Sequence, residues 1–272
     1  MLLKGITAIS AVLAVLLTIG KNWWLLPLYF ALCYSVLFLA ALLFMYVILR
    51  FVDIDREQEQ DSKFYRFFMY LYIDALKSLV LARVRTKGLE KTPKTGRFLL
   101  VCNHQQMADP GIIHSYFKKS QLAFISKQEN RTMPVIGKFM HKTMCQPLDR
   151  DNDRQALKVI LKCIQMLKND EVSVGVFPEG TRSRDGKVHP FRSGVFKIAQ
   201  KAEVPIVVCT INGTGPLFHN LKRLKPTPIE LHLVDVIPAE ELKGKTTAQI
   251  ADRVYELMIG DLGEAFRAEI PG

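Results

Sequence analysis

A histidine and an aspartate five residues apart could together do acid–base chemistry. His104 follows the apolar run of residues 97–102, and Asp109 stands directly before Pro110. An Asp-Pro pair is typical of a helix start, with Asp109 as the N-cap and Pro110 as the first helical residue. A carboxylate beside an imidazole orients the ring and stabilises its protonated form. The spacing therefore predicts a general base for a hydroxyl group, with His104 at a strand end and Asp109 at the next helix start.

Both residues also have ordinary structural interpretations. A lone histidine at a strand end is commonly a polar loop residue, and an aspartate before a proline is commonly only a helix cap. The spacing of His104 and Asp109 alone therefore leaves the catalytic pair as one hypothesis of two.

A second polar loop follows the apolar run of residues 172–177. Residues 177–186 read Phe-Pro-Glu-Gly-Thr-Arg-Ser-Arg-Asp-Gly. Gly180 permits a positive φ or a close backbone approach. Arg182 and Arg184 offer forked donors for phosphate oxygens. The loop predicts a phosphate site, and a solvated polar loop is the alternative.

Two further side chains of this loop bear polar groups. Thr181 offers a hydroxyl, and Glu179 is an acid among cations. Glu179 either holds Arg182 or backbone amides in place, or orients a bound acceptor.

Strand-like apolar runs alternate with helical segments and must position these loops. Strands are expected over residues 97–102, 122–126, 172–177, 206–211 and 229–234. Helices are expected over residues 153–169, 195–201 and 248–266. In the first of these helices, one face carries Leu157, Ile160, Leu161, Ile164 and Leu167. The alternation predicts an α/β fold whose mixed or mostly parallel central sheet is flanked by helices on both faces. Ligands are expected at the carboxyl ends of its strands.

The first 52 residues form a different, membrane-like segment with three basic residues and no acid. Residues 22–49 are an uncharged run of 28 residues, which as a helix is long enough to cross a bilayer. Trp23 and Trp24 stand at its start, where interfacial aromatic residues belong. Residues 5–20 are a second uncharged run of 16 residues, which is marginal for spanning.

Two topologies of this head are open. A hairpin of two spans is favoured because it leaves both ends of the head in the cytosol, where the body finds its substrates. In the other topology only the second run spans and the first lies in the interface. A cleaved signal peptide is not expected because the first run lacks a small-x-small exit. A buried pair of core helices is the remaining alternative.

An acidic and polar linker over residues 53–62 leads into a segment with helical apolar spacing. Its stripe consists of Phe64, Phe67, Phe68, Leu71, Ala75, Leu76, Leu79 and Val80. This helix either packs on the body or lies in the membrane interface, and the pattern favours neither.

The residues after the head carry 34 of the 37 Lys and Arg residues against all 26 acids, a net charge of +8. A basic body fits an anionic bilayer or phosphate-bearing substrates. Nucleic acid is not expected as a partner, because no zinc-finger spacing and no ribonucleoprotein-type aromatic motif occurs. The five scattered cysteines form no CxxC pair, so neither a disulfide framework nor a metal site is expected.

Together, the motifs resemble those of the lysophospholipid acyltransferase superfamily, and most closely the bacterial 1-acylglycerol-3-phosphate acyltransferases. Four blocks occur in the order of that family, at residues 103–109, 145–150, 177–194 and 204–214. A His-x4-Asp match alone is a weak signal, whereas four ordered blocks are specific.

The resemblance implies roles for the matching residues. His104 is the base and Asp109 is its orienting partner. The glycerol phosphate of the acceptor is bound by Arg150, Gly180, Thr181 and Arg182. Glu179 helps to position that acceptor.

The acyl pocket is implied to be supported by Val204 and Pro205. This sequence departs from the family pattern at Gln106, Met144, Pro147 and Val208. None of these departures removes a group that the chemistry needs, but they leave the acyl-chain and acceptor preference open. The implied division is a membrane-anchoring head at residues 1–52, a linker and interfacial helix at residues 53–88, and a catalytic domain at residues 89–272.

The function implied is transfer of a fatty acyl group from acyl-CoA or an acyl-carrier protein to the 2-hydroxyl of lysophosphatidic acid in the bilayer. The product is phosphatidic acid, an intermediate of phospholipid biosynthesis. No metal or cofactor is expected, and the catalytic domain is expected on the cytosolic side of the inner membrane. A covalent acyl-enzyme is not expected, because no Gly-x-Ser-x-Gly elbow occurs.

Three alternatives stand beside this function. The acceptor could be another lysophospholipid or glycerol 3-phosphate. The same pair could activate water in an acyl thioesterase. The chain could also be a membrane-bound binding or scaffold protein without catalysis.

Overall fold

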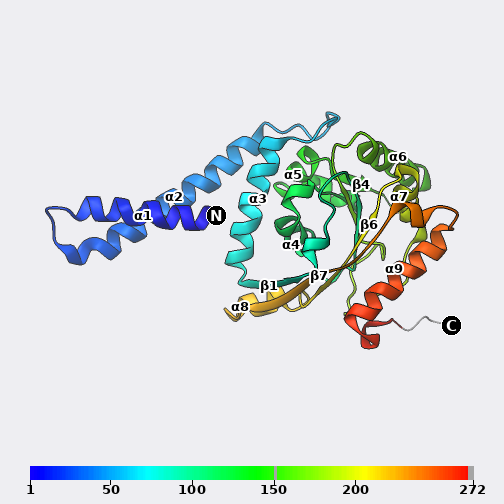
Figure 1. The fold of residues 1–272 in the computed structure, drawn as a ribbon. Coiled ribbons are helices and arrows are strands. Elements are labelled where there is room, and N and C mark those ends of the chain that lie inside the picture. Colours follow the sequence, from blue (N-terminus) through cyan, green and yellow to red (C-terminus); the bar gives the residue numbers. More distant parts are fainter. Residues whose placement is uncertain (150–151, 269–272) are drawn as a thin grey trace.

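The computed structural model describes residues 1–149 and 152–268. A pair of helices projects from an α/β body whose sheet runs through its centre (Figure 1). Its strands, within the described residues, are β1 (Ala82–Lys87), β2 (Leu99–Cys102), β3 (Ala123–Lys127), β4 (Gln146–Leu148), β5 (Val174–Val176), β6 (Ile206–Asn212) and β7 (Thr227–Ile237). The strand order is β1-β7-β6-β2-β5-β3-β4.

Neighbouring strands are parallel except for β6 and β7, which are antiparallel. The short helix α8 (Leu217–Lys222) joins these two strands, and so short a connection lets the chain turn back beside the strand it leaves. The expected α/β fold with a mostly parallel sheet is confirmed. The edge strands β1 and β4 are not predicted from the sequence. Strand β1 is rich in basic residues, and β4 has only three residues, so neither contains the apolar run of a central strand.

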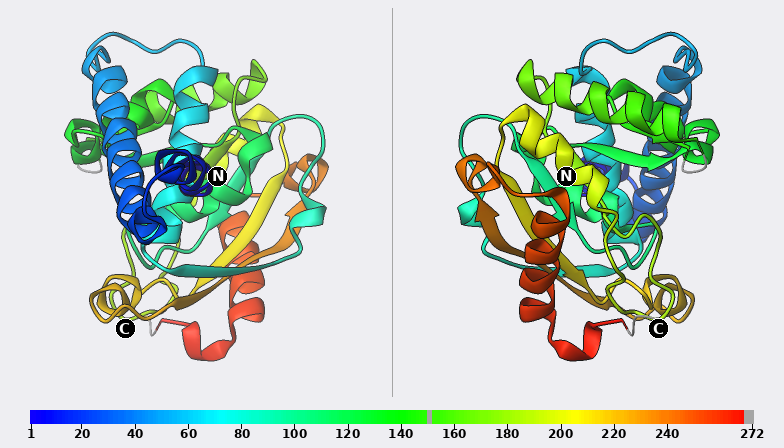
Figure 2. Two further views of the ribbon diagram at one scale, coloured as in Figure 1. Left: turned by 90° about the vertical axis from the view of Figure 1, so that its left-hand side faces the viewer. Right: turned by 90° about the vertical axis from the view of Figure 1, so that its right-hand side faces the viewer.

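Helices cover both faces of the sheet. One face carries α6 (Asp153–Lys168), α7 (Lys197–Ala202) and α9 (Thr247–Leu262). The other carries α4 (Asp109–Tyr116) and α8, with α3 (Lys63–Leu79) packed on α4 and α5 (Ile136–Lys142) packed on α3. Figure 2 shows the two sides, with the hairpin toward the viewer in the left panel and α9 in the right. Alternate residues of β2 enter the two cores, so this strand is buried on both faces.

Helix α6 begins at Asp153 as expected and ends one residue earlier than expected. Its buried face matches the expected one only in part: Leu167 is buried, and Ile160 and Ile164 pack against the core. Its buried apolar residues are Val159, Cys163, Met166 and Leu167. Leu157 and Leu161, two of the five residues on the expected face, are 54% and 56% exposed. The apolar face of α6 is wider than the part of the helix that packs on the sheet. Only the apolar residues that lie over the sheet are buried.

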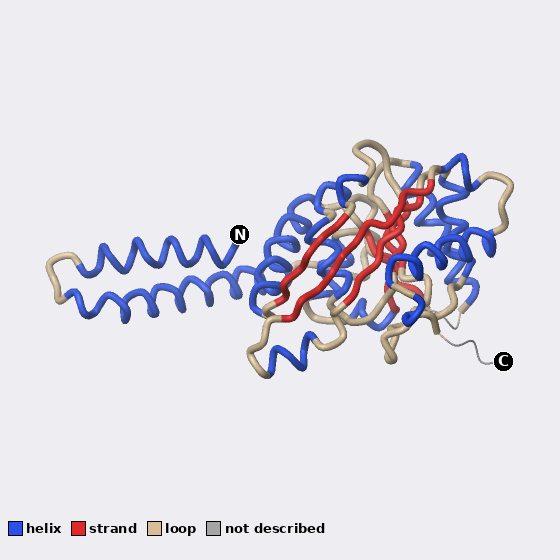
Figure 3. The backbone as a smooth tube through the Cα atoms, turned by 60° about the horizontal axis from the view of Figure 1, so that its bottom comes forward, coloured by secondary structure: helices blue, strands red, loops and turns tan. Residues whose placement is uncertain are grey.

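The head is an antiparallel hairpin of α1 (Leu2–Thr18) and α2 (Leu26–Arg50), and it extends away from the body (Figure 3). The segment Trp23–Arg50 is long and apolar enough to cross a membrane, and only 6% of its most apolar window is buried. The interpretation as a buried pair of core helices is therefore wrong. Helix α1, with 17 residues, is at the lower limit of length for a spanning helix. Whether one helix or both span stays a prediction.

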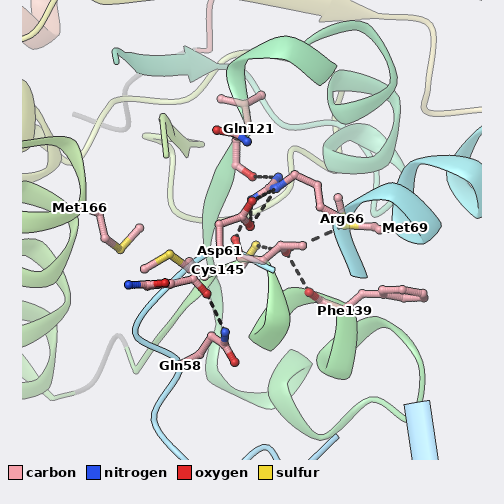
Figure 4. A network of polar contacts seen from close by, with 12 residues as sticks. Gln58, Asp61, Arg66, Met69, Gln121, Phe139, Cys145 and Met166 are labelled. Atoms are coloured by element: carbon pink, nitrogen blue, oxygen red, sulfur yellow. Dashed lines mark hydrogen bonds and ion pairs between the residues drawn. The ribbon is translucent and has the colours of Figure 1, made fainter. Parts of the chain in front are cut away.

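Helix α3 is attached to the body by a buried arginine (Figure 4). Arg66 Nε donates to both carboxylate oxygens of Asp61, at 2.9 and 2.7 Å. Its Nη1 donates to the carbonyl oxygen of Leu122 and its Nη2 to that of Thr143, at 2.8 and 3.0 Å. The first of the two interpretations of α3, packing on the body, is confirmed. The opposite flank still exposes apolar side chains at Phe64, Phe67, Leu76 and Leu79.

Candidate active site

The strand order brings the two polar loops together. Strand β2 lies between β5 and β6 and runs parallel to both, with Val101 opposite Val176 and Cys102 opposite Cys209. Because the carboxyl ends of parallel strands meet at one edge, the chain leaving β2 emerges beside the chain leaving β5. His104 lies two residues beyond β2. The site is therefore at the sheet edge where ligands of such folds bind.

Asn103 continues the ladder between β2 and β6 with its side chain. Its Nδ2 donates to the carbonyl oxygen of Ile211 at 2.9 Å, and its Oδ1 accepts from the amide of Ile211 at 2.8 Å. Asn103 is 2% exposed. These two bonds give the buried amide both a donor and an acceptor bond to one residue of β6, and they fix the point at which His104 leaves the sheet.

His104 and Asp109 are in direct contact. His104 Nδ1 lies 2.8 Å from Asp109 Oδ2. The same oxygen accepts from the amides of Gln105 and Gln106, each at 2.7 Å. Asp109 is fully buried, whereas the His104 side chain is 16% exposed. With Nδ1 donating to the carboxylate, the second ring nitrogen Nε2 is an acceptor, as a general base requires.

The role of Asp109 at the helix start differs from the expectation. Helix α4 begins at Asp109 itself, and Ala108 stands at the N-cap. The carboxylate reaches back to the turn before the helix instead of capping the helix. The amides that donate to this carboxylate belong to Gln105 and Gln106, which precede the helix.

A stack of rings holds the imidazole from one side. The Phe177 ring lies 4.1 Å from the His104 ring at an interplanar angle of 20°, and Phe124 stacks behind it at 5.3 Å and 14°. Gly175 makes room for this stack, because a Cβ there would lie 2.6 Å from the Phe124 ring. Phe177 was not singled out from the sequence. The feature that could have indicated Phe177 is its position directly after β5. The sequence does not state that β5 pairs with β2.

Glu179 joins the two loops. Its Oε1 accepts from the amide of His104 at 2.8 Å, and its Oε2 accepts from the amide of His189 at 3.2 Å. The side chain is buried, and burial raises the pKa of this carboxyl to about 7, with the two backbone hydrogen bonds opposing that shift. Of the two roles weighed for Glu179, the geometry matches the holding of backbone amides.

The loop after Glu179 runs alongside the imidazole. The amide of Ser183 donates to the carbonyl oxygen of His104 at 2.8 Å. Gly180 has a φ of +73°, and a Cβ there would lie 2.9 Å from Arg192 Nε, so this position favours glycine. Thr181 and Arg182 are exposed. An exposed guanidinium and hydroxyl on the loop that is bonded to the His104 backbone can bind an anionic group such as a phosphate.

Of the remaining expected residues, one lies outside the described part of the chain and two are not brought to His104. Arg150 lies outside the described residues. Val204 and Pro205 precede β6 at the amino edge of the sheet, and Val204 packs in the core beneath α7 and α9. Seven residues of β6 separate them from the His104 edge, roughly 20 Å at the rise of a strand. The structure gives them no place beside the imidazole.

The other end of the same motif block does reach the site. Gln105 Nε2 donates to Asn212 Oδ1 at 3.5 Å, and Thr214 Oγ1 donates to Gln105 Oε1 at 3.4 Å. Within the described residues, no group of three His, Cys, Asp or Glu side chains is arranged to hold a metal ion. The chemistry available here is therefore that of an oriented imidazole beside exposed anion-binding groups.

The sequence is similar to those of known acyltransferases. Residues 83–212 match the family model described as Acyltransferase. A chloroplast 1-acyl-sn-glycerol-3-phosphate acyltransferase of Brassica napus is 38% identical over 133 residues, which are 48% of this chain and 38% of that protein. A probable 1-acyl-sn-glycerol-3-phosphate acyltransferase of Mycoplasma pneumoniae is 34% identical over 174 residues, 62% of each chain.

A solved structure has a similar fold. The crystal structure of the 1-acyl-sn-glycerophosphate (LPA) acyltransferase PlsC from Thermotoga maritima matches with a TM-score of 0.61 and 25% identity, over 76% of this chain and 81% of that one. The chain spans between 38% and 55% of the length of the first three curated relatives. These comparisons confirm the resemblance drawn from the four motif blocks.

Proposed function

We propose that this chain moves a fatty acyl group from a thioester to the 2-hydroxyl of lysophosphatidic acid, which gives phosphatidic acid; the match of residues 83–212 to the family model described as Acyltransferase supports this. The observation that carries the proposal is the contact of His104 Nδ1 with Asp109 Oδ2 at 2.8 Å, on a backbone bonded to the loop of Arg182. A base and an anion-binding loop joined in this way suit a hydroxyl acceptor that carries a phosphate.

The reaction begins at His104. Its Nε2 takes the proton of the acceptor hydroxyl as that oxygen attacks the thioester carbonyl carbon. Asp109 stabilises the imidazolium that results. The tetrahedral intermediate then expels the thiol, which takes the proton from His104. Acyl-CoA and an acylated carrier protein both supply the thioester that this step needs, and the proposal assigns no metal or cofactor.

The negative oxygen of the intermediate needs hydrogen-bond donors. The amides of His104, Gln105 and Gln106 already donate to Glu179 and Asp109, and the amide of Met107 donates to Gln106 Oε1. These four amides are thus engaged and are not the donors. The proposal therefore requires other donors for the oxyanion.

The acceptor phosphate is placed against Arg182, with Thr181 and the backbone at Gly180 beside it. Arg150 is assigned to the same phosphate from the family resemblance alone. Glu179 is assigned a positioning role through the backbone of His104, because both of its oxygens are bound to amides. Val204 and Pro205 are assigned to the acyl pocket from the family resemblance alone, and they lie at the amino end of β6, roughly 20 Å from the edge that carries His104.

The head is proposed to attach the protein to the membrane, with the body on the cytosolic side of the inner membrane. The apolar segment Trp23–Arg50 and the exposed apolar flank of α3 support this placement. A lipid acceptor can then reach the site from the leaflet to which the body is attached.

The test is a comparison of His104→Ala with the wild-type protein, assayed with labelled acyl-CoA and lysophosphatidic acid. Loss of a general base is expected to lower kcat by about 10²- to 10⁴-fold. His232→Ala is the matched control. His232 lies on β7, and its Nδ1 is 3.3 Å from a carboxylate oxygen of Asp261 on α9, so it is also a histidine in contact with an aspartate. Transfer by His104→Ala within threefold of wild type would sink the assignment of the base. Release of free fatty acid without acceptor as the main reaction would instead support the thioesterase.

A further inference from the structure

The corner between β6 and β7 is a basic surface with an apolar tip. It comprises α8 and the turn that follows, residues 217–225, and is called the α8 corner below. Its cations Lys222, Arg223 and Lys225 are all exposed, and Leu224 between them is 79% exposed. Within residues 1–149 and 152–268, none of these three cations has an ion-pair partner.

Leu224 is held in a conformation that bulky residues avoid. Its φ is +52°, in the left-handed region. The turn is fixed by hydrogen bonds from the amides of Leu224 and Lys225 to the carbonyl oxygens of Leu221 and Asn220, both at 2.9 Å. These two bonds form a Schellman motif that ends α8 and account for the left-handed φ. The position is usually glycine, and here it presents a large apolar side chain to water, as an interaction surface does.

The α8 corner lies on the side of the body from which the hairpin emerges, next to β1 and the end of α3 (Figures 1 and 3). The amide of Thr227 donates to the carbonyl oxygen of Leu81 at 3.0 Å, which ties the corner to the segment after α3. Helix α3 adds two further exposed apolar side chains, Leu76 and Leu79, which are 59% and 48% exposed. Arg83 adds a further exposed cation on β1.

The corner is also adjacent to the loop of the catalytic base. It directly follows Thr214 and Gly215, and Gln106 Nε2 donates to the carbonyl oxygen of Gly215 at 3.4 Å. A surface that binds at the α8 corner therefore lies beside the loop of His104.

We propose that the α8 corner rests on an anionic lipid surface, with Leu224 in the interface and Lys222, Arg223 and Lys225 on the headgroup phosphates. The cations without ion-pair partners complement the negative charge of the headgroups. The exposed leucine favours a bilayer over an acidic protein, because acyl chains can accept an isolated apolar side chain without a matching pocket. The corner is a second attachment point beside the hairpin, and it sets the face of the body that meets the leaflet.

This inference rests on the proposed attachment of the hairpin to a membrane and not on acyl transfer. The full-length protein is placed on liposomes that contain a lipid quencher with brominated acyl chains. Liposomes of phosphatidylcholine are compared with liposomes that contain about one third phosphatidylglycerol. The native Cys33 on α2, labelled with bimane, reports insertion of the hairpin, since the other four cysteines are buried. Leu224→Cys in a Cys33→Ser background, labelled in the same way, reports the corner.

Bimane at position 224 is expected to be quenched on anionic liposomes at least about threefold more than on neutral ones. The double variant Arg223→Glu with Lys225→Glu, combined with the label, is expected to abolish that difference. Lys243→Glu with Lys245→Glu is the matched control. It makes the same change of charge on an exposed turn before α9, and it is expected to retain the quenching.

Quenching at Cys33 without quenching at position 224 overturns the inference and leaves the hairpin attachment standing. Absence of quenching at both positions overturns the attachment and the inference together. If an acidic carrier protein shields the bimane at position 224 from water and liposomes do not quench it, the corner binds that protein, and this result also overturns the inference. Quenching at position 224 in a protein without acyl transfer keeps the inference and rejects only the proposed reaction.

Discussion

The ring of Phe177 lies parallel to the imidazole of His104, with 4.1 Å between the ring centres. This contact and the bond from Nδ1 to Asp109 restrain the imidazole in two independent directions. The ring therefore needs little reorganisation when Nε2 takes a proton.

Phe177→Leu removes the stacked ring and keeps most of its apolar volume. We expect kcat to fall about tenfold with little change in KM, because the orientation of the base is lost and acceptor binding is not. Steady-state kinetics with lysophosphatidic acid measure both constants. Phe117→Leu makes the same change in the same core without touching His104, and it is expected to leave kcat unchanged. Equal losses in the two variants would show that stability and not orientation is responsible.

Asp109→Asn separates geometry from charge. Asp109 Oδ1 is buried without a hydrogen-bond partner, so an asparagine can place its NH₂ there and keep its oxygen on the ring and the two amides. We expect the fold to persist and kcat to fall by about 10²- to 10⁴-fold, since the imidazolium loses its counter-charge. Circular dichroism and kcat together provide the measurement. Asp261→Asn, the same change beside His232, is the control and should retain activity.

Glu179→Gln tests whether this residue acts through His104 or on the acceptor. The two carboxylate oxygens accept from two amides, and glutamine has one acceptor oxygen, so one amide loses its partner. We expect a kcat about tenfold lower at unchanged KM for lysophosphatidic acid. A higher KM at unchanged kcat would instead place Glu179 on the acceptor.

The same variant has an effect on stability that depends on pH. Burial raises the pKa of Glu179 to about 7, so the folded state binds its proton more tightly than the unfolded state. The stability that this group contributes is present below its ordinary pKa of 4.5 and is lost as pH rises to about 7. Relative to wild type, Glu179→Gln is expected to be more destabilised at pH 4.5 than at pH 7.5. Thermal melting in detergent at the two pH values measures this difference, and an equal offset at both would contradict it.

Asp61→Asn removes the counter-charge of a buried guanidinium. The Asp61 and Arg66 side chains are 8% and 4% exposed. Breaking such a pair leaves an uncompensated buried charge, and we expect a loss of about 3–5 kcal/mol of unfolding free energy. Urea denaturation of the detergent-solubilised protein provides the measurement. Asp170→Asn breaks the pair with Arg97, in which the aspartate is 73% exposed, and is expected to cost at most about 1 kcal/mol.

Some of this site could be read from residue order alone. A buried strand run that ends in polar residues predicts a loop at the carboxyl edge, and both His104 and the loop of Gly180 follow such runs. The contact of His104 with Asp109 is local, because a turn of a few residues closes it. Local patterns record which residues leave water and where the chain must turn, and that is the reason these predictions needed no tertiary information.

The remainder depended on which segments pair. Nothing in the local pattern states that β2 lies between β5 and β6, so it could not place Glu179 under the amide of His104, 75 residues away. The same strand order puts Asn212 at the site and Val204 at the far edge, although both belong to one motif block. Hydrophobic periodicity specifies burial along one element, whereas contacts between distant elements depend on how all elements fill the core together. The sequence by itself therefore determined the reactive residues and their loops, and the tertiary structure decided which of them meet.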